Sequence, residues 1–195
     1  TSKISGQTSW ITKYPISSIE ELAAYEPPIN DDEASERWSE GILDGQQKLA
    51  PLSYFVPGTG VGFHETYALM GQQLFSYAIY DAREHLDRIF ETFGHNSTKI
   101  AKHAAQKRYG PLFFTWADIA YKGQLLFSPA FLRETFIPML RNVCEPLNEA
   151  GMTVIFHSDG DVTEILDDMV DAGINGLNPI EPMAGMDIAA VKKRY

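Results

Sequence analysis

The sequence contains very little cysteine, since Cys144 is the only one among 195 residues. A single thiol excludes an internal disulfide and favours a reducing compartment, so we expect a cytoplasmic protein. Long apolar runs are absent as well. No stretch reaches the roughly 18 apolar residues that a membrane-spanning helix needs, and the polar N-terminal segment has no apolar signal core.

Positive charge is also scarce. The chain has 16 Lys and Arg against 26 Asp and Glu, for a formal net charge of -10. Nucleic acids and anionic membrane surfaces both need clustered basic residues, so neither is expected as a partner. The length suits one domain, which we take as residues 1–195. The chain begins without Met and stops inside the charged segment VKKRY, so we expect this domain to be incomplete at both ends.

The most informative stretch is MTVIFHSDG at residues 152–160. Its short apolar run at residues 154–156, rich in β-branched side chains, predicts a buried strand. The strand ends on His157 and, two residues later, Asp159, and a helical pattern follows. Ligands of parallel α/β folds bind at the carboxyl ends of the strands. This strand end is therefore a candidate site.

Two other predicted strands, at residues 111–115 and 174–177, also end near a carboxylate. Asp118 follows the first and Glu181 follows the second. If the strands are parallel, these side chains meet at the same edge of the sheet as His157.

A further strand is predicted at residues 51–56, before the glycine-rich segment PGTGVG. Its glycines permit close approach of the backbone to a ligand, so Gly58 is a candidate for substrate contact. The segment lacks the Lys-Ser/Thr ending of a phosphate-binding loop. His64 lies beside this turn, whereas His85, His95 and His103 are expected on the surface. Cys144 is expected to be a buried structural thiol.

Helical patterns fill most of the remaining chain, with a loop between residues 119 and 127. A short helix is expected from residue 18, after a serine cap, and further helices at 31–50, 64–80, 162–172 and 186–194. Another helix is expected to start at a capping box at 81–84 and to reach residue 110, with a break at 94–96. The helix at 128–151 is expected to bend at Pro138 and Pro146. The alternation predicts βαβ units around a parallel sheet. Four such strands make half of a (β/α)8 TIM barrel; an open doubly wound sheet is the alternative.

Residues 109–195 resemble the uroporphyrinogen decarboxylase (URO-D) superfamily, which includes the decarboxylase of porphyrin and haem biosynthesis and the cobalamin-dependent methyltransferases. The segments that carry the resemblance follow each other in the family's order and spacing: WADIAYKGQLLFSP, SPAFLRETFIP, EAGMTVIFHSDG, DAGINGLNPIEP and MDIAAVKKRY. Residues 15–110 resemble the family more weakly. The resemblance implies a (β/α)8 barrel with its site at the C-terminal mouth, of which this chain is the middle part.

The methyltransferase branch of the family carries a zinc-binding His-x-Cys motif at the strand that here ends on His157. In this sequence Asp159 stands at the cysteine position, and a carboxylate oxygen also ligates Zn²⁺. The resemblance thus implies a metal-dependent, corrinoid-linked methyltransferase. His157 and Asp159 would bind zinc, and a separate corrinoid protein would carry the methyl group. Asp118 and His157 are the expected catalytic residues, with Asp118 or Glu181 orienting the imidazole.

Two alternatives remain open at this point. The first is tetrapyrrole decarboxylation, a lyase reaction that uses a small-molecule substrate and no cofactor. The second is a non-catalytic barrel fragment that binds a ligand or a partner chain, in which His157 is only a polar cap on a strand end. Half a barrel exposes a sheet edge, so a homo-oligomer is expected for such a fragment.

Overall fold

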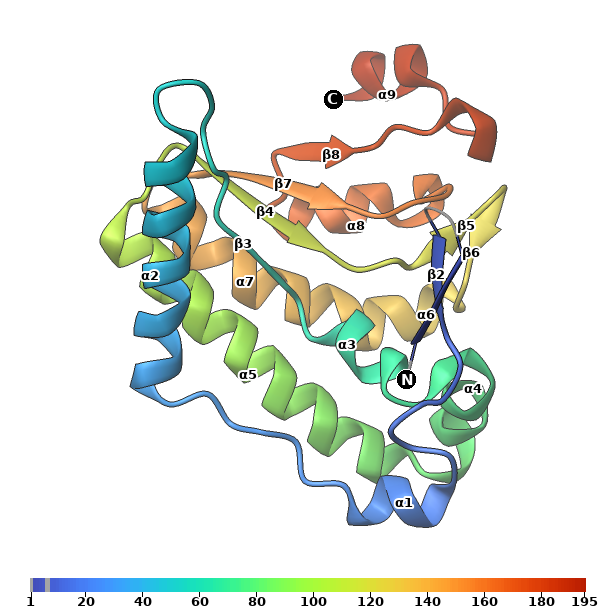
Figure 1. The fold of residues 1–195 in the computed structure, drawn as a ribbon. Coiled ribbons are helices and arrows are strands. Elements are labelled where there is room, and N and C mark those ends of the chain that lie inside the picture. Colours follow the sequence, from blue (N-terminus) through green and yellow to red (C-terminus); the bar gives the residue numbers. More distant parts are fainter. Residues whose placement is uncertain (1, 6–7) are drawn as a thin grey trace.

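The computed structural model describes residues 2–5 and 8–195 (Figure 1). The strands are β1 (Ser2–Ser5), β2 (Thr8–Ile11), β3 (Gly58–Gly60), β4 (Leu112–Trp116), β5 (Ala120–Tyr121), β6 (Gln124–Leu125), β7 (Thr153–His157) and β8 (Gly176–Asn178). The α-helices are α1 (Ile19–Ala24), α2 (Asp32–Leu49), α3 (Phe63–Ala68), α4 (Gly71–Asp81), α5 (Arg83–Lys107), α6 (Pro129–Phe131), α7 (Ile137–Glu149), α8 (Leu166–Asp171) and α9 (Ile188–Arg194). One π-helical turn (Leu132–Phe136) and two 3-10 turns (Thr163–Ile165 and Pro182–Ala184) complete the helical elements described.

Four strands form one parallel sheet in the order β3-β4-β7-β8, which confirms the predicted α/β class and parallel pairing. Each new strand is added beside the previous one, in chain order. The remaining described strands form two antiparallel pairs, β1 with β2 and β5 with β6. The register pairs Trp116 of β4 with His157 of β7, and His157 with Asn178 of β8. The carboxyl ends of these three strands therefore lie at one edge.

The two faces of this sheet are covered differently. Helices α5, α7 and α8 lie together on one side of it (Figure 1), and α7 packs against both α5 and β7. Phe113 and Phe156 point to this side and are completely buried, with the Phe156 ring 5.7 Å from that of Phe136. Side chains alternate along a strand, so Phe114 and Ile155 belong to the opposite face, where they are only half-buried.

The strand predicted at residues 51–56 is wrong. That segment turns and is largely exposed, and Leu52 is 93% exposed. The strand is instead β3, inside the glycine-rich segment. A Cβ on Gly58 would lie 2.4 Å from the backbone oxygen of Phe114, so the close packing of β3 against β4 requires a residue without a side chain at this position. The apolar run at 51–56 has no buried sheet face on which to pack, so its β propensity does not make it a strand. The glycine-rich segment pairs with β4 instead, because its backbone can approach that strand closely.

The helix predicted at residues 64–80 is split into α3 and α4, which meet at Met70 and Gly71. The predicted capping box at 81–84 is also wrong, although the helix does begin there. Asp81 is the last residue of α4, and the N-cap of α5 is Ala82, which offers no side-chain acceptor.

The break predicted at residues 94–96 does not occur, because α5 runs through it without interruption. Asn96 lies inside the helix and connects it to another segment of the chain. Its side chain accepts a hydrogen bond from Asn30 N–H (2.8 Å) and donates one to the carbonyl of Pro28 (2.7 Å). These bonds tie the segment before α2 to the middle of α5.

The helix predicted at residues 128–151 begins as expected, with the Ser128 hydroxyl accepting the Phe131 N–H and Pro129 in the first turn. The expected bend near Pro138 takes the form of the π-helical turn, in which Ile137 N–H donates to the carbonyl of Leu132. A proline lacks the N–H of a regular helix and its ring crowds the preceding turn, so a widened turn before Pro138 relieves this conflict. Pro146 lies inside α7 without ending it.

The C-terminal elements follow the prediction with small shifts. The strand predicted at 174–177 is β8, displaced toward the C-terminus, and the segment predicted as a loop at 119–127 contains the β5–β6 hairpin. In the part of the chain that the structure describes, no helix is long and apolar enough to cross a membrane.

Candidate metal centre

Three predicted site residues meet at the carboxyl edge of the sheet. His157 is the last residue of β7, Asp159 lies two residues beyond it, and Asp118 follows β4. Because β4 and β7 are parallel neighbours, their exits are adjacent. One ligand atom from each of the three side chains lies within 4.8 Å of the others. Asp118, His157 and Asp159 are hereafter called the triad.

The His157 imidazole lies farther from the two carboxylates of the triad than direct hydrogen bonding allows. His157 Nε2 lies 3.8 Å from Asp118 Oδ1 and 3.9 Å from Asp159 Oδ1. Such distances leave room for an atom between the groups, since a direct N–H···O bond spans about 2.7–3.2 Å. Asp118 and His157 are 39% and 31% exposed and Asp159 is 70% exposed. The triad is therefore open to solvent and to small molecules.

Asn178 fixes the orientation of the His157 ring. Its amide Oδ1 lies 3.1 Å from His157 Nδ1. A carboxamide oxygen only accepts, so this contact suits an imidazole tautomer with its proton on Nδ1 and the lone pair on Nε2, the nitrogen that faces the two carboxylates. This is the tautomer that a metal-binding imidazole needs. The prediction that Asp118 or Glu181 orients the ring did not include Asn178, although Asn178 stands at the end of the next predicted strand in the sequence.

Glu181 lies close to the triad but supports the backbone and makes no described contact with the imidazole. Its Oε2 accepts the N–H of Gly160 at 2.9 Å. Gly160 has φ +89°, and a Cβ there would lie 2.4 Å from the Tyr121 nitrogen. The buried Ser158 hydroxyl accepts the N–H of Ile119, which joins the loop after β7 to the loop after β4.

The β5–β6 hairpin forms backbone hydrogen bonds with the loops that follow β7 and β8. The N–H of Asp161 donates to the carbonyl of Tyr121 (3.1 Å), and that of Gly123 donates to the carbonyl of Ala184 (2.7 Å). The loops after β4, β7 and β8 are thus connected through one short hairpin.

On its other side, Asp118 faces a second imidazole. Its Oδ2 lies 3.5 Å from His64 Nδ1, and its N–H donates to that nitrogen at 3.2 Å. The Tyr67 hydroxyl lies 2.9 Å from His64 Nδ1 and 2.8 Å from the carbonyl of Asp118. Burial, followed by the negative charges of Asp118 and Glu65, raises the pKa of Tyr67 above its ordinary value. Tyr67 therefore remains a phenol and a hydrogen-bond donor.

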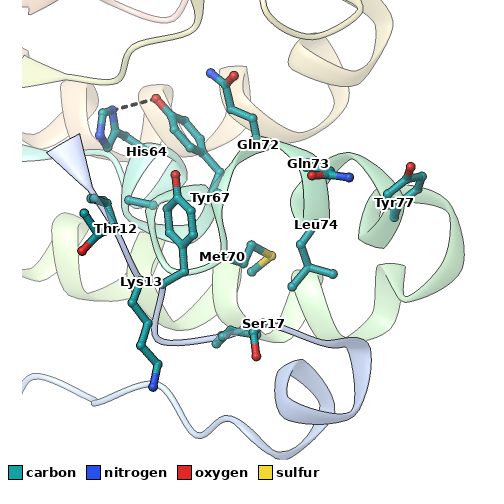
Figure 2. A pocket seen from close by; sticks show the side chains of 15 residues that line it. Thr12, Lys13, Ser17, His64, Tyr67, Met70, Gln72, Gln73, Leu74 and Tyr77 are labelled. Atoms are coloured by element: carbon teal, nitrogen blue, oxygen red, sulfur yellow. Dashed lines mark hydrogen bonds between the residues drawn. The ribbon is translucent and has the colours of Figure 1, made fainter. Parts of the chain in front are cut away.

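His64 also borders a cavity of about 910 Å³. The cavity lies between the chain segment after β2, helix α3 and the first turns of α4. Figure 2 shows His64 and Tyr67 at one end and Tyr77 at the other, with Met70 and Leu74 between them. The sequence places His64 beside the glycine-rich turn but contains no pattern that would predict this cavity.

Two other predicted residues lie away from the triad. Gly58 is in β3 beside Phe114, two residues before the strand ends, and its carbonyl accepts the indole N–H of Trp38 (3.2 Å). Cys144 is buried in α7, as expected, and burial raises the pKa of its thiol to about 12. A thiol of this kind is a poor nucleophile and a poor metal ligand.

Comparison with protein-family models and with curated proteins found no match to this chain. The resemblance to the uroporphyrinogen decarboxylase superfamily therefore stays a prediction that rests on the quoted segments.

Proposed function

We propose that this chain belongs to a metal-dependent methyl-transfer enzyme of the uroporphyrinogen decarboxylase superfamily. The observation that carries the proposal is the triad, an imidazole and two carboxylates that converge at the carboxyl edge of a parallel sheet. That edge is where parallel α/β enzymes place their catalytic groups.

The sheet supports the barrel that this family implies. In a (β/α)8 barrel successive strands are added in chain order and all connecting helices lie on the outer face. Doubly wound sheets instead reverse their strand order and carry helices on both faces. The order β3-β4-β7-β8, with α5, α7 and α8 on one side, fits the first arrangement. Phe114 and Ile155 would then face the interior of the complete barrel.

The triad offers a donor set that suits zinc. One imidazole nitrogen and two carboxylate oxygens form a three-ligand site, which leaves one tetrahedral position for a substrate. His157 Nε2 is already oriented by Asn178, and the neighbouring loops are held by Ser158 and Glu181. Bound zinc would lower the pKa of a coordinated thiol or hydroxyl and so activate the methyl acceptor. A separate corrinoid protein would carry the methyl group.

Elemental analysis tests this proposal. Protein purified without chelator should contain close to one zinc per chain, and His157→Ala should lose it. His95→Ala provides the matched control, because His95 is an exposed histidine on α5 outside the triad. Wild-type protein without bound metal, even after incubation with excess zinc, would reject the proposal.

A second function has one observation in its favour. Asp118 lies between two imidazoles, with Oδ2 toward His64 and Oδ1 toward His157. Such a group can hold and pass a proton without a metal, as a decarboxylation requires when the bond to CO₂ is replaced by a bond to hydrogen. A metal-free wild-type protein in the experiment above would move support to this reaction, with a tetrapyrrole carboxylate as substrate.

A further inference from the structure

The peptide groups that follow β4 are held from two different sides. The N–H of Ala117 donates to the carbonyl of His157 at 3.1 Å, which ties it to β7. The N–H of Ile119 donates to the Ser158 hydroxyl at 3.2 Å, in the loop after β7. Asp118 stands between these two residues, yet its own N–H and carbonyl meet side chains of α3. The backbone position of this triad residue therefore depends on α3.

Two side chains of α3 make these contacts, His64 and Tyr67, which are three residues apart and so lie on the same side of the helix. The N–H of Asp118 donates to His64 Nδ1 at 3.2 Å, and the Tyr67 hydroxyl donates to the carbonyl of Asp118 at 2.8 Å. The hydroxyl also lies 2.9 Å from His64 Nδ1, the contact drawn in Figure 2. A backbone N–H only donates, so the geometry suits a neutral imidazole with its lone pair on Nδ1. One helix face thus satisfies both polar groups of the Asp118 backbone.

Helix α3 is itself firmly anchored. Tyr67 is only 7% exposed, and its ring centre lies 5.9 Å from that of Phe75 and 5.8 Å from that of Phe127. At the start of the helix, Glu65 Oε2 accepts the N–H of Gly62 at 3.0 Å. Moving the Tyr67 hydroxyl would disrupt this aromatic packing, so the phenol is a donor held in one place.

The carboxylate of Asp118 is held much less closely than its backbone. Its Oδ1 accepts the N–H of Asp159 at 3.4 Å, and its Oδ2 lies 3.5 Å from His64 Nδ1. The same Oδ1 lies 3.8 Å from His157 Nε2. Hydrogen bonds of ordinary length span about 2.7–3.2 Å, so these side-chain contacts are weak. The direction of the carboxylate consequently depends on where the backbone is held, and that place is fixed from α3.

We propose that His64 and Tyr67 are positioning residues of the candidate metal centre. They hold the Asp118 backbone so that its carboxylate stays directed toward the nitrogen of His157 that faces the triad. The effect on metal binding rests on the proposed function. The restraint on Asp118 does not, because it consists of hydrogen bonds within the chain and can be measured in metal-free protein.

Zinc affinity, measured by competition with a chromophoric chelator, gives the first test. Tyr67→Phe keeps the packed ring and removes only the hydroxyl, and His64→Leu removes the acceptor. Each should weaken zinc binding by roughly 10- to 100-fold, the usual effect of losing the group that supports a ligand. His64→Asn should recover most of the affinity, because a carboxamide oxygen can accept the Asp118 N–H in place of Nδ1. A purely structural role of His64 would be lost in both His64 variants alike.

Tyr80→Phe is the matched control, since Tyr80 is an exposed residue of α4 with no described contact to Asp118. The second test needs no metal. In chelator, hydrogen exchange of the Asp118 amide should be slow in wild type and in Tyr80→Phe. It should be roughly five- to tenfold faster in His64→Leu, as expected when one hydrogen bond is lost.

The two tests separate this inference from the proposed function. Exchange and zinc affinity that match wild type in both His64→Leu and Tyr67→Phe would overturn the inference. If wild type binds no zinc while exchange of the Asp118 amide follows the expected pattern, the proposed function fails and the restraint on Asp118 stands. If wild type binds zinc and both variants bind it equally well, the proposed function stands and the positioning role fails.

Discussion

The two faces of the parallel sheet are built from similar residues but are packed differently. On the helix-covered face, Phe113, Val154 and Phe156 have no exposed surface. On the other face, Phe114 and Ile155 stay half-exposed, although they are as apolar as their neighbours in sequence. Parallel sheets are normally buried on both faces. The open face therefore has the apolar composition of a buried sheet face. Most of the free energy of folding from this sheet comes from the face that the helices cover.

Phe156→Ala provides the largest test of this comparison. The substitution removes a fully buried ring that packs against Phe136, so it should lower the free energy of unfolding by about 3–5 kcal/mol. Ile155→Ala, one residue away on the open face, should cost less than about 1.5 kcal/mol, because much of its surface is already in water. Urea unfolding of both variants measures the difference. Equal losses would mean that another chain or segment covers the open face in solution.

Asn178→Ala tests a polar residue of the same open face, at the end of β8. The variant should fold with nearly unchanged stability, because the side chain is exposed. Its zinc affinity should fall by roughly 10- to 100-fold, the usual effect of losing the group that orients a ligating histidine. Competition with a chromophoric chelator measures this affinity. Asn175→Ala is a poor control, since that side chain bonds to β7; Asn142→Ala on α7 is better. Unchanged zinc affinity in Asn178→Ala would show that the Asn178 side chain does not orient the His157 ring for metal binding.

Near neutral pH the smallest effect is expected from the ionisation of Cys144, on the helical side, and this effect grows only in alkaline solution. The pKa of the Cys144 thiol is raised from 9.0 to about 12 because burial disfavours the thiolate. A pKa that is higher in the folded than in the unfolded protein stabilises the fold below the unfolded value, and this contribution is lost as pH rises between the two. Stability should therefore decline between about pH 9 and pH 12 more in wild type than in Cys144→Ala. Below pH 9 the thiol should react with iodoacetamide only after unfolding; rapid reaction of the native protein would contradict the burial of α7.

The sequence predicted most of the parallel sheet and the convergence of Asp118, His157 and Asp159 in the candidate site. The apolar runs before Asp118 and His157 located β4 and β7, because buried strands with polar exits leave a strong local pattern. The sequence failed to predict β3, because Gly58 of this strand packs against the backbone of Phe114 in β4, and no propensity scale records such a contact. It could not give the cavity beside His64, because its walls come from segments that meet only in the folded chain.

The β5–β6 hairpin has a consequence for how this site can change. Through Tyr121 and Gly123 it bonds to the loops after β7 and β8, and Ser158 bonds back to the loop after β4. Substitutions in these three loops should therefore be non-additive, since a shift in one loop moves the partners of the others. Any change in the geometry of the triad would therefore need several loop positions to change together, and a single replacement transplanted into these loops would rarely reproduce its effect elsewhere.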